Sequence, residues 1–261
     1  MSMDWQLRQS GPSDGRATVL LLPGGMCSAG SYAEVMAQPG LAGLRLVAAT
    51  LPGQAGAPPP DKYSVERYAE LTAALATEVG ADVVVGFSMG AVVALEMVIS
   101  GAFTGPTVLL GVSMSRADEP AFFRALVRAG DVLGGVPAAV LAKGAAAMVG
   151  KVDLPAERRA ELRADFAKNV PRHQQPALRA YLRWLHRHEQ RAERLCAAGV
   201  PTWVVHAEKG DGGLTAQERR VLEACPHIRV VTIAGAVFFL PNEVPERVAD
   251  LIAEAAAQVR R

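Results

Sequence analysis

Asp82-Val-Val-Val-Gly86-Phe-Ser88-Met-Gly90 is the stretch that decides the fold. A run of β-branched residues ends at Gly86, Ser88 lies between two glycines, and an apolar segment begins at Met89. This order predicts a buried strand, a sharp turn and a helix, with the Ser88 hydroxyl raised at the turn. Such a turn leaves no room for side chains two residues before and after the serine, a condition that Gly86 and Gly90 satisfy.

Strands and helices alternate on both sides of this stretch. Buried strands are predicted at 17–22, 44–50, 82–87, 106–112, 201–206 and 229–233, with a further edge strand within 1–16. Alternation of this kind predicts an α/β fold, a mostly parallel central sheet with helices on both faces.

The alternation stops between residues 114 and 198. No strand pattern occurs there, and helical patterns cover 120–133, 138–149, 155–169 and 176–196. The sequence therefore predicts an inserted all-helical cap at 114–198 and a core made of 1–113 and 199–261.

Charge and composition exclude several classes of partner. The 261 residues carry 27 Lys and Arg against 26 Asp and Glu, so the net charge of +1 gives no case for nucleic acid or an anionic membrane. Arginines cluster in 158–191, where interleaved acids favour a solvated helical face. No apolar run is long enough to span a bilayer. A monomer and a homodimer both remain open.

Cysteine usage and motifs address compartment and cofactors. Cys27, Cys196 and Cys225 are odd in number, far apart and without metal-ligand spacing, which indicates free thiols in a cytoplasmic protein. No metal cluster, dinucleotide fingerprint or phosphate-binding loop motif occurs, so we expect no metal and no cofactor.

Pro23-Gly24-Gly25 directly follows the predicted strand 17–22 and forms a glycine turn. With this turn, the Ser88 turn (the elbow) and the strand order in place, the chain resembles the α/β-hydrolase superfamily over nearly its whole length. The resemblance implies that Ser88 is the nucleophile and that the backbone N–H groups of Gly25 and Met89 form the oxyanion hole. The family's acid follows the strand 201–206. Asp211 is the first candidate for that acid and Glu208 the second.

The family's histidine is missing from its usual place. In Ile233-Ala-Gly-Ala-Val-Phe238-Phe-Leu-Pro-Asn-Glu243-Val-Pro-Glu246, Phe238 stands where the resemblance implies the histidine. Phenylalanine cannot accept a proton. A base would have to be water, His206 or a histidine of the cap. The cap histidines are His173, His186 and His188, and His227 belongs to the opposite end of the sheet.

These patterns predict a weak or atypical serine hydrolase that acts on a small hydrophobic ester, thioester or lactone. Two alternatives stay open: a binding protein that kept the pocket, and a cofactor-free lyase or cyclase that uses the oxyanion hole. The expected apolar lining of the substrate pocket consists of Met26, Phe87, Phe122, Phe238 and Phe239.

Overall fold

A single seven-stranded sheet organises the chain. The computed structural model describes residues 3–119, 121–133, 136–150, 154–187, 190–210 and 213–259. Within these ranges the strand order is β1-β3-β2-β4-β5-β6-β7, in which β1 pairs antiparallel with β3 and every other pair is parallel. The strands are β1 (Leu7–Ser10), β2 (Thr18–Leu22), β3 (Arg45–Ala49), β4 (Val83–Phe87), β5 (Thr107–Leu110), β6 (Thr202–Ala207) and β7 (Ile228–Ile233). The predicted mostly parallel sheet is confirmed.

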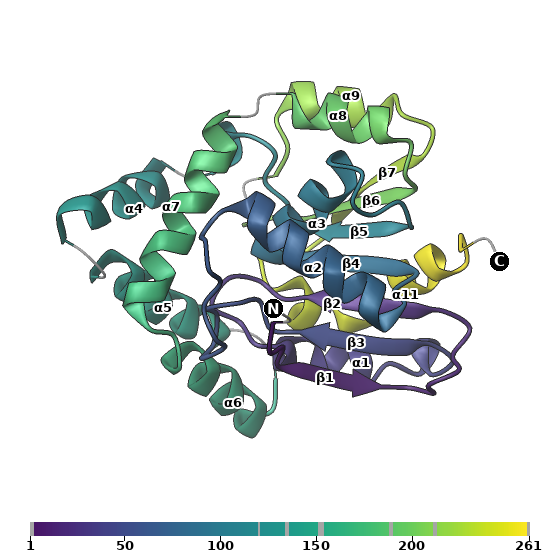
Figure 1. Cartoon of the computed structure of the whole chain (residues 1–261), viewed down its shortest axis with the longest axis horizontal. Coiled ribbons are helices and arrows are strands. Elements are labelled where there is room, and N and C mark those ends of the chain that lie inside the picture. Colours follow the sequence, from purple (N-terminus) through teal and green to yellow (C-terminus); the bar gives the residue numbers. More distant parts are fainter. Residues whose placement is uncertain are drawn as a thin grey trace.

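Helices cover both faces of this sheet, as predicted (Figure 1). One face packs on η1 (Ala29–Tyr32), α1 (Ala33–Met36), η2 (Pro39–Leu41), α10 (Leu240–Glu243) and α11 (Pro245–Ala256). The other packs on α2 (Val65–Val79), α3 (Met89–Ile99), α8 (Arg191–Ala198) and α9 (Ala216–Glu223). Side chains of β4 alternate between the two cores, so that Phe87 faces the α11 side and Val84 the α3 side.

Local signals start and stop these helices where the sequence places them. The Ser64 hydroxyl accepts a hydrogen bond from the Arg67 N–H at the start of α2, and Gly80 ends that helix in the left-handed conformation. A capping box formed by Thr215 and Glu218 begins α9.

Four further helices, together called the helical insertion, lie between β5 and β6. They are α4 (Ala121–Leu133), α5 (Val136–Val149), α6 (Ala156–Ala167) and α7 (Pro171–Arg187), and they are preceded by the short η3 (Arg116–Asp118). Figure 1 shows them gathered to the left of the sheet.

The predicted single helix at 176–196 is wrong. The α7 helix already begins at Pro171 and contains Pro176, and α8 starts separately after Gln190. Pro171 occupies the first helical position, where a missing N–H costs nothing. Gln190 has a φ of +70°, which interrupts the helical path.

The prediction of three free cysteines is also wrong. Cys196 of α8 and Cys225, two residues beyond α9, form a disulfide with a Cα–Cα distance of 5.8 Å. The two helices lie side by side in Figure 1, a proximity that 29 residues of sequence separation conceal. Only the buried Cys27 remains a free thiol, so the cysteines no longer support a reducing compartment.

Among the described residues, no helix combines the length and the apolar character needed to cross a bilayer.

Candidate active site

Ser88 lies on a strained turn between the end of β4 and the start of α3. Its backbone angles are φ +49° and ψ −113°, a conformation that L-residues rarely adopt. A methyl group on Gly86 would overlap the Gly90 carbonyl, and one on Gly90 would overlap the Leu22 carbonyl. The steric account of the glycine-flanked serine is therefore confirmed, and the Ser88 side chain is left partly exposed.

The loop that follows β2 lies directly against this turn. A methyl group on Gly24 would sit 3.1 Å from the Phe87 ring and 3.4 Å from Ser88 Cβ, and one on Gly25 would sit 3.6 Å from Met89 Cβ. Within the described part of the chain, the Gly25 N–H donates to no acceptor. The Met89 N–H is the first of α3 and has no partner inside the helix. Two amide donors are thus available close to Ser88.

Met26, the next residue of this loop, is held from two sides. Its N–H donates to Gln54 Oε1 over 2.7 Å, and its carbonyl accepts from Asn169 Nδ2 over 2.8 Å. Asn169 Oδ1 also accepts from the Ala55 N–H over 2.8 Å. Met26 has a φ of +67°, so these bonds stabilise an unfavourable backbone conformation beside Gly25.

We call Gln54 and Asn169, which bond the two sides of the Met26 backbone, the clamp residues. The sequence analysis did not identify either of them. Gln54 is the only polar side chain in the apolar loop from Leu51 to Pro60, and that isolation was the available signal. Asn169 follows α6 in the helical insertion, and nothing in its sequence context marks it. The structure therefore joins the insertion to the glycine loop through a contact of high sequence separation.

Phe238 lies in an aromatic cluster next to Ser88. Its ring centroid is 5.5 Å from that of Phe87 and 5.1 Å from that of Phe239, both in edge-on arrangements. Phe166 of α6 extends the cluster, 6.3 Å from Phe239. Edge-to-face pairs of this kind add about 0.5–1.5 kcal/mol each to the burial of the rings.

The backbone that carries Phe238 is fixed by a carboxylate. Glu243 accepts hydrogen bonds from the N–H groups of Val237 over 2.7 Å, Phe238 over 3.0 Å and Phe239 over 2.7 Å. The loop therefore keeps its shape independently of the side chain at position 238.

The predicted acid loop packs against this same segment. Glu208 Oε2 accepts from the Gly235 N–H over 2.8 Å, and the Lys209 N–H donates to the Ala236 carbonyl over 3.1 Å. Glu208 is exposed and engaged with backbone. Asp211, the preferred acid, lies outside the described residues.

Within the described residues, the Ser88 hydroxyl makes no hydrogen bond to an imidazole or to any other group. His206 is buried near the end of β6, and β5 separates that strand from β4, which puts the strands about 10 Å apart. His173 Nδ1 is engaged with the Tyr63 hydroxyl at 2.8 Å. His186 is exposed on α7, and His188 lies outside the described residues.

The predicted apolar lining of the pocket is only partly gathered around Ser88. Met26, Phe87 and Phe239 are buried around the elbow, but Phe122 is 70% exposed on α4 and does not join the cluster. Its neighbour Phe123 is the residue that turns inward, 6.4 Å from Tyr181. One helical step of about 100° separates these adjacent side chains, and the sequence pattern did not resolve it.

Cys27 is the other candidate nucleophile close to the elbow. Burial raises the pKa of its thiol to about 12, and the negative charge of Asp165 adds to the effect. The thiolate is therefore scarce at neutral pH, and Cys27 cannot replace Ser88 as a nucleophile. Among the described residues, no group of His, Cys, Asp and Glu has the arrangement of a metal site.

Known proteins with the same fold are numerous but distant. The chain superposes on a thermophilic esterase from Thermogutta terrifontis with a TM-score of 0.74 and 18% identity, covering 100% of this chain and 98% of the esterase. It superposes on a thioesterase domain from the curacin biosynthetic pathway with a TM-score of 0.69 and 18% identity, covering 97% of this chain and 99% of the thioesterase domain. It superposes on a haloalkane dehalogenase loop variant from Bradyrhizobium elkanii with a TM-score of 0.71 and 20% identity, covering 97% of this chain and 93% of the dehalogenase.

Sequence comparison gives the family. No curated protein matches the chain significantly. The sequence profile of the Alpha/beta hydrolase family matches residues 19–251, which is most of the chain. Together with the parallel sheet and the serine turn after β4, this match shows that the chain belongs to the Alpha/beta hydrolase family.

Proposed function

We propose that this protein is a slow, atypical serine hydrolase that acts on a small hydrophobic ester, thioester or lactone. The observation that carries the proposal is the strained Ser88, at φ +49°, with the amide donors of Gly25 and Met89 beside it. Holding a residue in such a conformation costs about 1–3 kcal/mol. A site that only bound an apolar molecule would have no use for that strain.

The chemistry follows from these three groups. Ser88 Oγ forms a bond to the acyl carbon, and the carbonyl π electrons move to the oxygen, which the Gly25 and Met89 N–H groups stabilise. Collapse then breaks the bond to the alcohol, thiol or ring oxygen, and water carries the Oγ proton to that leaving group. A second water attacks the acyl-serine, releases the acid and returns the proton to Oγ. Each amide donor contributes about 10²–10³ in rate.

Proton transfer is the weak step, because Phe238 offers no acceptor. Loss of the base from a serine triad costs about 2 × 10⁶ in kcat in a well-studied protease, whereas about 10³–10⁴ over water survives. We therefore expect slow turnover rather than none. Asp211 remains a predicted acid, and without an imidazole it has no ring to orient.

The helical insertion, α4 to α7 within the predicted cap range 114–198, acts in this proposal as a cap. Phe166 reaches the aromatic cluster from α6, and Asn169 bonds the loop that carries Gly25. The insertion thus supplies both apolar surface and loop support beside Ser88. Phe87, Phe238 and Phe239 make the expected lining apolar, which is why we propose a hydrophobic acyl group.

A second candidate is binding of a small hydrophobic molecule without chemistry. Phe238 favours it, because an aromatic ring packed on Phe87 replaces a proton acceptor with apolar contact surface.

Labelling by a fluorophosphonate, followed by intact mass measurement, separates the two. We expect slow labelling of the wild type, none of Ser88→Ala, and labelling of Phe238→His about 10²-fold faster or more, as a positioned general base provides. Phe239→His is the matched control, because it puts an imidazole one residue away, and it should not accelerate labelling.

The labelling results distinguish a slow hydrolase from a binding protein. If only Phe238→His is labelled, the native protein is the binder. If neither the wild type nor Phe238→His reacts over days, the assignment of Ser88 as a nucleophile is wrong.

A further inference from the structure

A cavity lined mainly by arginine side chains lies between α4 and α7. Its volume is about 510 Å³. We call it the arginine groove, and it is lined by Arg116, Arg124, Val127, Arg128, Arg179, Leu182, Arg183, His186 and Arg187. Among the described residues that line it, none is acidic. This concentration of positive charge contrasts with a net charge of only +1 for the whole chain.

On both helices the arginines recur every four residues, so that they lie on one face of each helix. Arg124 and Arg128 are four residues apart on α4, and Arg179, Arg183 and Arg187 repeat every four residues on α7. Like charges at this spacing destabilise a helix by about 0.2–0.5 kcal/mol per pair. The α7 helix contains four Arg, two His and no acid. The predicted interleaving of acids in 158–191 is therefore true of α6, and wrong for α7.

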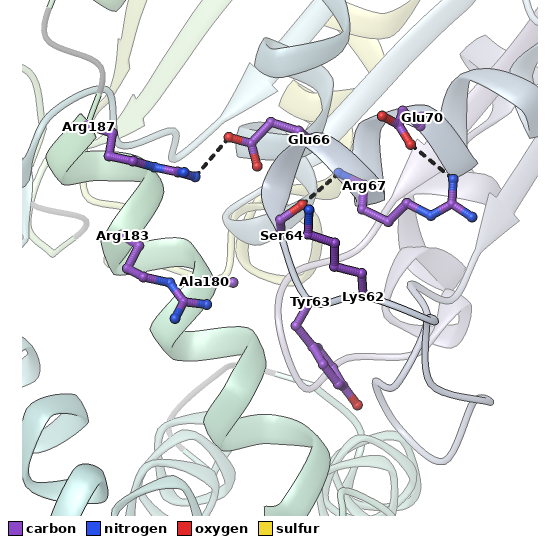
Figure 2. A pocket seen from close by; sticks show the side chains of 9 residues that line it. All are labelled: Lys62, Tyr63, Ser64, Glu66, Arg67, Glu70, Ala180, Arg183 and Arg187. Atoms are coloured by element: carbon purple, nitrogen blue, oxygen red, sulfur yellow. Dashed lines mark hydrogen bonds and ion pairs between the residues drawn. The ribbon is translucent and has the colours of Figure 1, made fainter.

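A neighbouring cavity gives an internal comparison. It has a volume of about 400 Å³ and lies between α2 and α7, and its lining residues are drawn in Figure 2. There Glu66 pairs with Arg187 over 3.0 Å and Glu70 with Arg67 over 2.9 Å, so two acids pair with two of the four cationic side chains of the lining. Arg183 makes no ion pair among the residues drawn (Figure 2). The neighbouring cavity therefore contains acids that pair with part of its positive charge, whereas the described lining of the arginine groove contains no acid and shares only Arg183 and the paired Arg187 with it.

Some of the groove's arginines are held in place by carbonyls. Arg124 donates to the carbonyls of Arg116 and Glu119, and Arg179 donates to the Gly130 carbonyl over 2.9 Å. These bonds orient the guanidinium groups of Arg124 and Arg179. Within the described part of the chain, Arg128 and Arg183 have no carboxylate partner.

The chemistry of the lining selects a ligand class. A guanidinium presents a planar fork of donors that matches two phosphate oxygens, and several such forks require more than one anionic group. The volume falls within the range of about 300–1,000 Å³ usual for small-molecule sites. The buried Val127 and the half-buried Leu182 add apolar surface. We propose that the arginine groove binds a small molecule that carries at least two phosphate groups.

Calorimetric titration of the full chain with pyrophosphate tests this. We expect saturable binding that weakens between about 20 mM and about 150 mM salt, because screening reduces the attraction. The double variant Arg128→Gln/Arg183→Gln should raise Kd about tenfold or more, since charge-assisted hydrogen bonds are lost. The matched control Arg219→Gln/Arg247→Gln removes the same charge from exposed sites on α9 and α11 and should leave Kd unchanged.

Several results would overturn the proposal. These are no saturable binding, equal weakening in the control variant, or tighter binding of citrate or of a short oligonucleotide than of pyrophosphate. If the double variant fails to fold, Arg183→Lys keeps the charge but loses the fork, and unchanged affinity would be equally damaging. Ser88→Ala should bind pyrophosphate like the wild type, so this test is independent of the proposed hydrolase activity.

Discussion

Replacing Asn169 by alanine should loosen the helical insertion from the sheet domain. The side chain bonds two core groups, the Met26 carbonyl and the Ala55 N–H, each over 2.8 Å. Both core residues are buried, so the variant leaves one acceptor and one donor of the sheet unit unsatisfied. Gln174 Nε2 also loses its bond to Asn169 Oδ1 but keeps its bond to the Gly53 carbonyl. At about 1–1.5 kcal/mol for each of the two bonds to Met26 and Ala55, the free energy of unfolding should fall by about 2–3 kcal/mol. For a chain of this size that is a fall in Tm of roughly 4–12 °C.

Calorimetry and urea unfolding measure the change. Lys168→Ala is the matched control: its exposed ammonium pairs only with Asp165 at the surface, so its removal should cost under about 0.5 kcal/mol. Asn169→Asp divides the effect, because it keeps the acceptor for the Ala55 N–H and loses the donor to Met26. Its Tm should lie between those of the alanine variant and the wild type.

The same variant also tests whether the insertion supports the site. Since Met26 adjoins Gly25, Asn169→Ala should slow fluorophosphonate labelling of Ser88 as well. An unchanged Tm would show that the two bonds contribute nothing, and the clamp argument would fail. A lowered Tm with an unchanged labelling rate would limit Asn169 to a structural role.

Three further predictions concern the elbow, the free thiol and a buried carboxyl. Gly90→Ala should abolish or strongly destabilise the fold, because its methyl group would overlap the Leu22 carbonyl; a wild-type Tm would contradict the elbow geometry. Iodoacetamide at pH 8 should modify no cysteine in the native protein, since the pKa of Cys27 is about 12, and unreduced unfolding should expose one thiol; mass measurement checks both. Burial raises the pKa of Asp118 to about 7, with the Glu218 charge adding, so the native state holds a proton that the unfolded chain releases. Stability should therefore fall as pH rises from about 4 to about 7, and Asp118→Asn should remove that part of the slope; parallel Tm profiles would refute it.

Local chemistry explains what the sequence could predict. The Ser88 turn, the Ser64 and Gly80 ends of α2 and the Thr215 capping box depend on residues within a few positions of one another. Steric clashes and caps of this range can be worked out from residue order alone. The parallel sheet followed because six buried strands alternate with helices.

Tertiary proximity explains what it could not. The Cys196–Cys225 disulfide depends on how α8 packs beside α9, and the Asn169 clamp on where α6 meets the glycine loop. No local pattern encodes either contact. The contrast between the charge-balanced α6 and the acid-free α7 is different, because it can be read from the residue order of each segment once the helix bounds are known.

The Glu243 carboxylate, which holds three successive amides around Phe238, has a consequence for protein engineering. Because Glu243 anchors the main chain there through backbone amides and not through the Phe238 ring, we expect position 238 to tolerate different side chains without a change of the loop. A saturation library at this one codon would sample proton acceptors of different strength on an otherwise constant scaffold. Such a series would measure how much a lone imidazole, carboxylate or amine contributes to a serine enzyme.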